Sequence, residues 1–180
     1  MDLKETMVSR EQVYEGPVFT VTKDAIRLPD GSDGRRDLVH SLGGVVILPV
    51  DGEGNVTLVR QYRYAHGKVL TEAVAGKLEP GEDPYPAAKR ELREETGFTA
   101  GRWTFLGAIE TSPGFLTEVL YLYLAQDLTR GEQELDEGEF LELRSCPLEE
   151  AWEKAALGMI TDAKTLAVLM RAKYLLKKGE

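Results

Sequence analysis

The chain has 180 residues, of which 42% are hydrophobic, so it is long enough for one domain with a sizeable core and a small appendage. Its net charge of −9 argues against nucleic acid or an anionic membrane as the main partner, and its single cysteine excludes an intrachain disulfide. The charged N-terminus lacks an apolar segment and no run approaches membrane-spanning length, so we expect a cytoplasmic protein.

The first part of the chain predicts strands. Residues 1–16 are polar, and we expect them to be frayed or to form a short strand. Loose alternation over 17–28, the turn sequence PDGSDG and a resumed strand over 35–42 predict a β-hairpin. The continuous apolar run VVILPV at 45–50 is typical of a strand buried on both faces, and a further strand is predicted over 56–65.

A helix is predicted over 84–96. Asp83 is a good N-cap, Pro84 suits the first helical position because its missing N–H costs nothing there, and Gly97 supplies the left-handed residue that ends the helix. The apolar residues of this helix line one narrow side of it, and they are Ala87, Ala88 and Leu92.

Three carboxylates share another face of this helix. Glu91 and Glu95 are four residues apart and Glu94 is three from Glu91, so they repel one another by roughly a few tenths of a kcal/mol per pair. One interpretation is a solvated helix in which Arg90 pairs with Glu94. The other is a site for a hard divalent cation such as Mg²⁺, which takes carboxylate oxygens as ligands. The helix alone leaves both open.

Beyond this helix, strands are predicted over 103–110 and 118–125, followed by an acidic, polar stretch at 127–139 and a short strand at 140–145. Two helices complete the chain, over 147–157 and from Thr161 or Asp162 onward. The apolar positions expected to form the core side of the last helix are Ala163, Leu166, Ala167, Met170 and Tyr174.

The stretch from Gly76 to Phe98 resembles the signature of the Nudix hydrolases, G-x5-E-x7-R-E-U-x-E-E-x-G-U, with U a bulky apolar residue. A chance match in one register has odds of roughly one in ten million or rarer, since each residue type has a frequency of about a tenth or less. Downstream, Pro113 with Phe115 resembles the mark of the ADP-ribose pyrophosphatase branch. The fixed signature positions are all matched, by Gly76, Glu82, Arg90, Glu91, Leu92, Glu94, Glu95, Gly97 and Phe98.

The resemblance implies an α/β fold, a Nudix-type α/β/α sandwich with a mixed sheet, plus N-terminal antiparallel strands. Residues 1–43 would be an N-terminal β-hairpin region used for dimerisation, and 44–180 the catalytic domain. In the implied homodimer the N-terminal strands reach the partner, so that Arg35 or Arg36 would touch substrate held by the other subunit. We choose Arg36 for this role.

The resemblance also implies a metal site. Glu91 and Glu95 would bind the essential Mg²⁺, for which Mn²⁺ is an alternative, helped by the main-chain carbonyl of Ala75. Arg90 would hold the glutamates in place, with Glu94 nearby, and both are assigned catalytic roles. The signature residue Glu82 would brace the loop or join the outer metal shell.

In this branch the loop matching 127–139 closes over the cleft. Glu137 matches the proposed catalytic base, with Asp136 as an alternative, and Glu139 matches a further metal ligand or its neighbour. Mobile loops commonly complete such sites only when substrate arrives.

Substrate contacts are implied by the same similarity. Arg63 would contact the diphosphate or ribose, and Glu72 a ribose hydroxyl or the adenine side; the alternative is that both are ordinary solvated charges. Pro113 and Phe115 would belong to the substrate loop. Lys164, near the start of the last helix, is as well explained by packing or capping as by a substrate contact.

The implied function is Mg²⁺-dependent hydrolysis of small molecules linked through a nucleoside diphosphate, with ADP-ribose giving AMP and ribose 5-phosphate. One alternative is a Nudix hydrolase of another nucleotide sugar or dinucleotide. Another is a module that senses ADP-ribose without cutting it; such modules typically have damaged glutamates, whereas this chain retains them.

Overall fold

The computed structural model describes residues 2–178, with side chains to 177, and the chain forms two compact units. The first contains the chain up to Gly43 together with Glu110–Val119. The second contains Gly44–Ile109 and the chain from Leu120 onward. None of the helices in the described part combines the length and apolar character that crossing a membrane requires.

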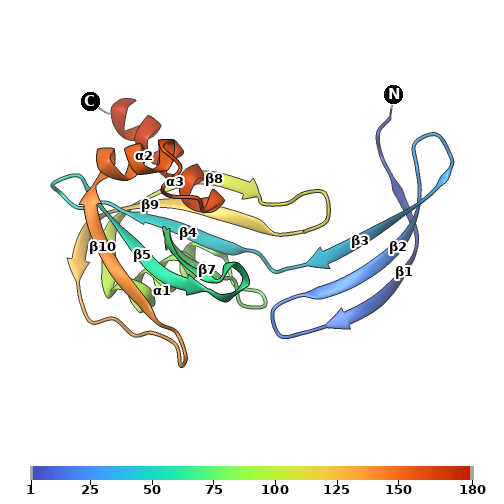
Figure 1. Cartoon of the computed structure of the whole chain (residues 1–180), viewed down its shortest axis with the longest axis horizontal. Coiled ribbons are helices and arrows are strands. Elements are labelled where there is room, and N and C mark those ends of the chain that lie inside the picture. The colour runs from blue at the N-terminus through green and yellow to red at the C-terminus, as the bar shows by residue number, and fades with distance from the viewer. Residues whose placement is uncertain (1, 179–180) are drawn as a thin grey trace. The chain divides into compact units, whose positions relative to one another are not determined.

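The first unit is built on a three-stranded antiparallel sheet in the order β1-β2-β3 (Figure 1). Its strands are β1 (Thr6–Glu15), β2 (Thr20–Arg27) and β3 (Asp33–His40). The predicted hairpin is confirmed as β2 and β3. Residues 1–16 were expected to be frayed or to form a short strand; they contain a strand, β1, which at ten residues is longer than expected. All residues of β1 are exposed, so the sequence shows no alternation of apolar and polar residues there. The strand is defined by its pairing with β2.

The second unit contains a four-stranded mixed sheet in the order β7-β4-β9-β8. Strand β4 runs antiparallel to β7 and parallel to β9. The strands are β4 (Gly44–Pro49), β7 (Val74–Lys77), β8 (Phe98–Glu110) and β9 (Val119–Arg130).

A second sheet of this unit has the order β10-β5-β6 and is antiparallel throughout. Its strands are β5 (Asn55–Arg63), β6 (Lys68–Glu72) and β10 (Leu141–Pro147), and the short 3-10 helix η1 (Tyr64–His66) links β5 to β6.

Helices cover both faces of the mixed sheet, as Figure 1 shows. On β4, Val45 and Ile47 pack in one cluster with α1 (Pro84–Thr96). Val46 and Leu48 point the other way and pack with α2 (Leu148–Ala156) and α3 (Ala163–Lys178). These side chains are fully buried, each worth roughly 1.5–3 kcal/mol relative to exposure. The predicted α/β/α sandwich with a mixed sheet is therefore confirmed.

The predicted core side of α3 is partly wrong. Met170 and Tyr174 are 53% and 64% exposed, and Ala163 is exposed as well. The fully buried residues of this helix are Thr165, Val168, Leu169 and Ala172. Apolar residues occur on more than one side of α3, so periodicity alone does not fix which side faces the sheet.

Candidate active site

The α1 helix is preceded by a loop that Arg90 ties to it. Arg90 Nε and Nη2 donate to the Glu82 carboxylate at 3.1 and 2.9 Å, and Nη2 also donates to the Lys77 carbonyl oxygen at 3.2 Å. Its Nη1 donates to Glu91 Oε1 at 2.7 Å and to Glu94 Oε2 at 3.1 Å. Hydrogen bonding to Arg90 lowers the pKa of Glu82, whose carboxylate also accepts the Glu79 N–H. One guanidinium thus fixes the loop and two of the three helix carboxylates.

Gly76 on β7 makes room for a carboxylate. A Cβ atom at this position would lie 1.8 Å from Glu91 Cδ and about as close to both carboxylate oxygens. No side chain fits there without displacing Glu91. Glycine is thus required by the close approach of the helix carboxylate to the strand backbone. Burial raises the pKa of Glu91, and Arg90 partly opposes that shift.

Glu95 is the most deeply buried carboxylate of α1, only 4% exposed, and among the described residues its Oε2 atom has no hydrogen-bond partner. Burial, with the charges of Glu139 and Glu91, raises the pKa of Glu95 to about 8. A backbone hydrogen bond from Ala75 and the charge of Arg63 act in the opposite direction. A buried carboxylate without a counterion is costly, and a bound cation would relieve it.

The residues at this position fit a hard divalent cation by donor type. Glu91, Glu95 and Glu139 supply carboxylate oxygens whose charges act on one another, and Glu95 has a buried oxygen that protein groups leave unused. Among the described side chains, no three of His, Cys, Asp or Glu are grouped closely enough to hold an ion as they stand. Arg90 occupies Glu91 Oε1, so a metal shell requires that carboxylate to turn.

A second charged cluster lies at the end of β5 and β6. Arg63 Nε and Nη2 donate to the two oxygens of Glu72 at 2.7 and 2.8 Å, and Lys164 of α3 donates to Glu72 Oε2. Glu72 is 1% exposed; burial opposes its ionisation, but the hydrogen bonds from Arg63 and Lys164 outweigh this and lower its pKa. Neither Arg63 nor Glu72 is a free solvated charge. Arg63 is near enough to Glu95 for its charge to act on that carboxylate.

The acidic loop after β9 is attached to the C-terminal end of α1. Gly131 N donates to the Gly97 carbonyl at 2.7 Å, Glu134 N to the Glu94 carbonyl at 3.0 Å, and the Gln133 side chain to the Glu95 carbonyl at 2.5 Å. These bonds use carbonyls that a helix leaves unpaired in its last turn.

Beyond this attachment the loop carries the two predicted acidic residues. Glu139 is half-buried and raises the pKa of both Glu91 and Glu95, so it belongs to the carboxylate cluster. Gln61 donates a long hydrogen bond to it, at 3.5 Å. Glu137 is exposed, as is its alternative Asp136, whose carbonyl accepts the Glu139 N–H. The structure thus distinguishes Glu139, whose charge acts on the α1 carboxylates, from Glu137, which is exposed.

The remaining predicted residues belong to the first unit. Arg36 on β3 pairs with Glu5, with its Nε 3.0 Å from Glu5 Oε2. Pro113 and Phe115 are exposed in the loop before β9, which is hydrogen-bonded to β3 through Val39 N and the Phe115 carbonyl at 2.7 Å.

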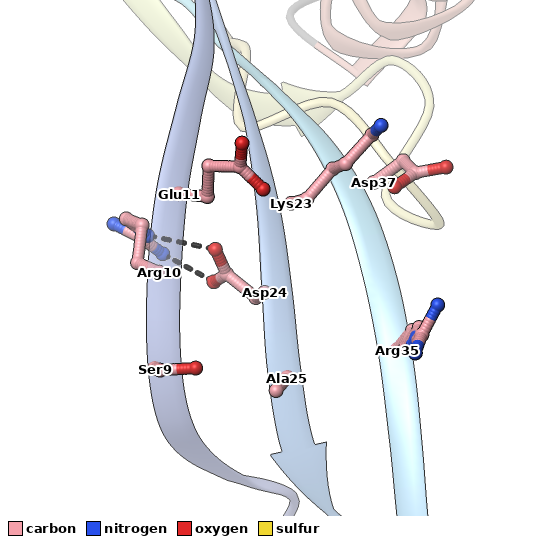
Figure 2. Close-up of a pocket in the computed structure, with 8 residues that line it drawn as sticks. All are labelled: Ser9, Arg10, Glu11, Lys23, Asp24, Ala25, Arg35 and Asp37. Atoms are coloured by element: carbon pink, nitrogen blue, oxygen red, sulfur yellow. Dashed lines mark hydrogen bonds and ion pairs between the residues drawn. The ribbon is translucent and has the colours of Figure 1, made fainter.

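The β1-β2-β3 sheet also has a hollow of about 560 Å³ lined by charged side chains of all three strands (Figure 2). There Arg10 makes a bidentate pair with Asp24, at 2.9 and 2.6 Å, and that pair lowers the pKa of Asp24. Nothing in the sequence spacing indicated this hollow, because its residues come together through strand register.

Sequence reasoning missed two positions near the α1 cluster, Gln61 and Gln133. Both act through a side-chain amide on a residue far away in the chain, to Glu139 and to the Glu95 carbonyl. No local spacing marks such contacts. For Gln61, the alternation of β5 would have been the available signal, since it sets which side chains share a face with Arg63.

Comparison with known proteins assigns almost the whole chain to two family models. The model described as NUDIX domain matches residues 40–169. The model described as nucleoside diphosphate sugar hydrolase N-terminal domain matches residues 5–39.

Individual relatives cover most of the chain as well. It is 39% identical to an ADP-ribose pyrophosphatase of Bacillus subtilis (strain 168), over 91% of this chain and 89% of that protein. It is 38% identical to a methanol dehydrogenase activator of Bacillus methanolicus, with the same coverage. A crystal structure of an ADP compounds hydrolase superposes with a TM-score of 0.86 at 26% identity, covering 98% of this chain and 96% of that one.

Proposed function

We propose, from the fact that this chain belongs to the NUDIX family, that it hydrolyses ADP-ribose to AMP and ribose 5-phosphate. The chain is a Nudix pyrophosphohydrolase similar to ADP-ribose pyrophosphatases, which makes a nucleoside diphosphate linked compound its substrate class. The observation that carries the proposal is the set of carboxylates on α1 and its loop, held by Arg90, with one buried oxygen of Glu95 unused.

Hydrolysis adds one water across a phosphoanhydride: a P–O bond forms to the water oxygen, the bridging P–O bond breaks, and one proton must leave the water. Glu91, Glu95, Glu139 and the Ala75 carbonyl are the groups we assign to Mg²⁺ or Mn²⁺. When bound, such an ion neutralises charge on the phosphate oxygens and lowers the pKa of water. Arg90 keeps Glu91 and Glu94 oriented, and Arg63 supplies a positive charge for the diphosphate.

Glu137 is our choice for the base that removes the proton from water. Its exposure suits a group that moves into the site when substrate arrives, and the bonds between Gly131–Glu134 and α1 give the loop a fixed stem. Pro113 and Phe115 are proposed to contact the substrate.

We also propose a homodimer in which Arg36 contacts substrate held by the partner. Strand β1 is exposed along its whole length and carries the exposed apolar residues Met7, Val8, Val13 and Tyr14. An exposed edge strand of this kind is normally covered by another chain or blunted by charge. The cytoplasmic location stays a prediction.

A substrate panel tests the activity. With Mg²⁺ present, kcat/KM is measured for ADP-ribose, NAD⁺, GDP-mannose and a diadenosine polyphosphate, with products identified by chromatography. We expect the highest value for ADP-ribose, with equimolar AMP and ribose 5-phosphate. A clear preference for another compound assigns the chain to a different Nudix activity. Tight binding of ADP-ribose without turnover would make it a sensing module.

A further inference from the structure

The buried carboxylate of Glu72 has two cationic partners that come from distant parts of the sequence. Arg63, on the neighbouring strand β5, makes a bidentate pair with it. Lys164, on α3, donates to Oε2 and has a side chain only 16% exposed. Both oxygens of Glu72 are therefore already used within the protein. A ribose hydroxyl or adenine group could bind Glu72 only by displacing one of these partners.

Lys164 is itself held in place from its own helix. Its Nζ is 2.9 Å from Asp162 Oδ1. The other oxygen of Asp162 accepts the Thr165 N–H at 3.0 Å and the Thr165 hydroxyl at 2.5 Å. The Thr165 hydroxyl oxygen in turn accepts the Ala73 N–H at 2.7 Å, directly after Glu72 in the chain. The start of α3 is thus bonded to the strand end that carries Glu72.

The position of Arg63 depends on this arrangement. Its Nε and Nη2 are used by Glu72, and in the described part of the chain no hydrogen bond of Nη1 is seen. The guanidinium also lies near enough to Glu95 to influence that carboxylate. A group aimed in this way can contact an anion that binds beside the α1 carboxylates.

We propose that Lys164 is a positioning residue for substrate binding. Lys164 holds the carboxylate of Glu72 in place, and Glu72 orients the guanidinium of Arg63 toward the diphosphate. This rests on the proposed function, because Arg63 is taken to contact that substrate. Glu72 then orients Arg63 and does not itself bind ribose. Without Lys164, Glu72 is held by Arg63 alone, so its carboxylate is less firmly fixed and Arg63 is aimed less precisely at the diphosphate.

Lys173 provides a matched control on the same helix. Its side chain is 11% exposed, its Nζ is 2.7 Å from Glu149 Oε1, and it lies over the ring of Trp152 at 4.5 Å. It is therefore also a largely buried, paired lysine of α3. Its partners are on α2, so a purely structural effect of losing a lysine should appear equally in Lys173→Met.

The test compares KM and kcat for ADP-ribose, together with melting temperature, in wild type, Lys164→Met, Lys164→Arg and Lys173→Met. We expect Lys164→Met to raise KM roughly tenfold with a smaller change in kcat, because the charge-assisted contact of Arg63 with the diphosphate is weakened. Lys164→Arg should recover most of the affinity. Lys173→Met should lower the melting temperature and leave KM unchanged.

A wild-type KM in Lys164→Met, or an equal rise in Lys173→Met, would overturn the proposal. If Lys164→Met does not fold, Glu72→Gln/Lys164→Met removes one buried charge of each sign; it should fold and retain the raised KM, and a normal KM would refute the role. Failure of the proposed function appears separately, as a wild type that prefers another substrate of the panel. The variants are then compared on that substrate.

Discussion

Of the α1 carboxylates, Glu95 has the environment in which a bound cation would stabilise the charge most. The spacing of the α1 glutamates predicted a shared face, but it could not show which carboxylate is buried or that Oε2 lacks a partner in the described structure. The helix is packed against β7, where Gly76 allows Glu91 to approach, and the charge of Glu139 from the distant loop adds to the raised pKa of Glu95. Glu91 and Glu95, whose spacing predicted repulsion on one helix face, are therefore largely buried in the folded chain.

Glu95→Gln should lower kcat by more than about a hundredfold, since even changes outside a ligand set commonly cost 10–100-fold. The same change should stabilise the metal-free protein. The unfolded chain ionises this group near the ordinary value of 4.5, whereas the folded chain holds the proton until the pKa of about 8. The unfavourable contribution of Glu95 to stability therefore grows as pH rises through that window.

Melting temperatures in EDTA at pH 5 and pH 8 measure this contribution. The gain in Glu95→Gln over wild type should be larger at pH 8. Glu94→Gln is the control on the same helix, because Glu94 is paired with Arg90 and its loss removes an ion pair. An equal gain in both variants, or near-normal turnover in Glu95→Gln, contradicts the assignment.

Among the elements, the loop after β9 is hydrogen-bonded to the C-terminal end of α1. The last turn of a helix leaves carbonyls unpaired, and this loop pairs those of Glu94, Glu95 and Gly97. The close passage also requires glycine at 97, where φ is +73° and a Cβ would lie 2.7 Å from the Gly131 carbonyl oxygen. The stem of the loop is therefore attached to α1, whereas Glu137 and Glu139 lie beyond these bonds.

Gln133→Glu should weaken this attachment. The new carboxylate cannot donate to the Glu95 carbonyl, and it places negative charge at the negative end of the helix dipole. We expect kcat to fall about tenfold and the amides of Gly131 and Glu134 to exchange faster, as measured by hydrogen exchange. Glu132→Gln, a change in the exposed neighbouring side chain, is the control. Unchanged exchange in Gln133→Glu would exclude the capping role.

Some of these elements could be predicted from the sequence and others could not. Hairpin β2-β3 and helix α1 were predictable because a turn sequence, Pro84 and Gly97 mark their ends. The length of β1 and the presence of β6 were not, since β1 is fully exposed and β6 is mainly polar and short. The contacts of Gln133 and Lys164 join segments distant in sequence, and only the tertiary fold brings them together.

At the scale of the whole molecule, the residues predicted from the sequence fall in both units. The carboxylates, Arg63 and Glu72 belong to the second unit, whereas Arg36, Pro113 and Phe115 belong to the first. A homodimer with a two-fold axis would repeat any shared contact at both sites. Sedimentation at micromolar concentration should therefore show a dimer, and a monomer would remove the shared-site hypothesis.

Subunit mixing tests the sharing directly. Arg36→Ala should lower kcat/KM by at least about tenfold if Arg36 contacts the substrate of the partner, since a charged contact is lost. Glu95→Gln inactivates the other half of the same composite site. In a mixed dimer one site collects both defects and the other has none, so mixing and exchanging the two variants should restore about a quarter of wild-type activity. If Arg36 instead acts within its own subunit, every site in the mixture keeps one defect, and mixing restores nothing.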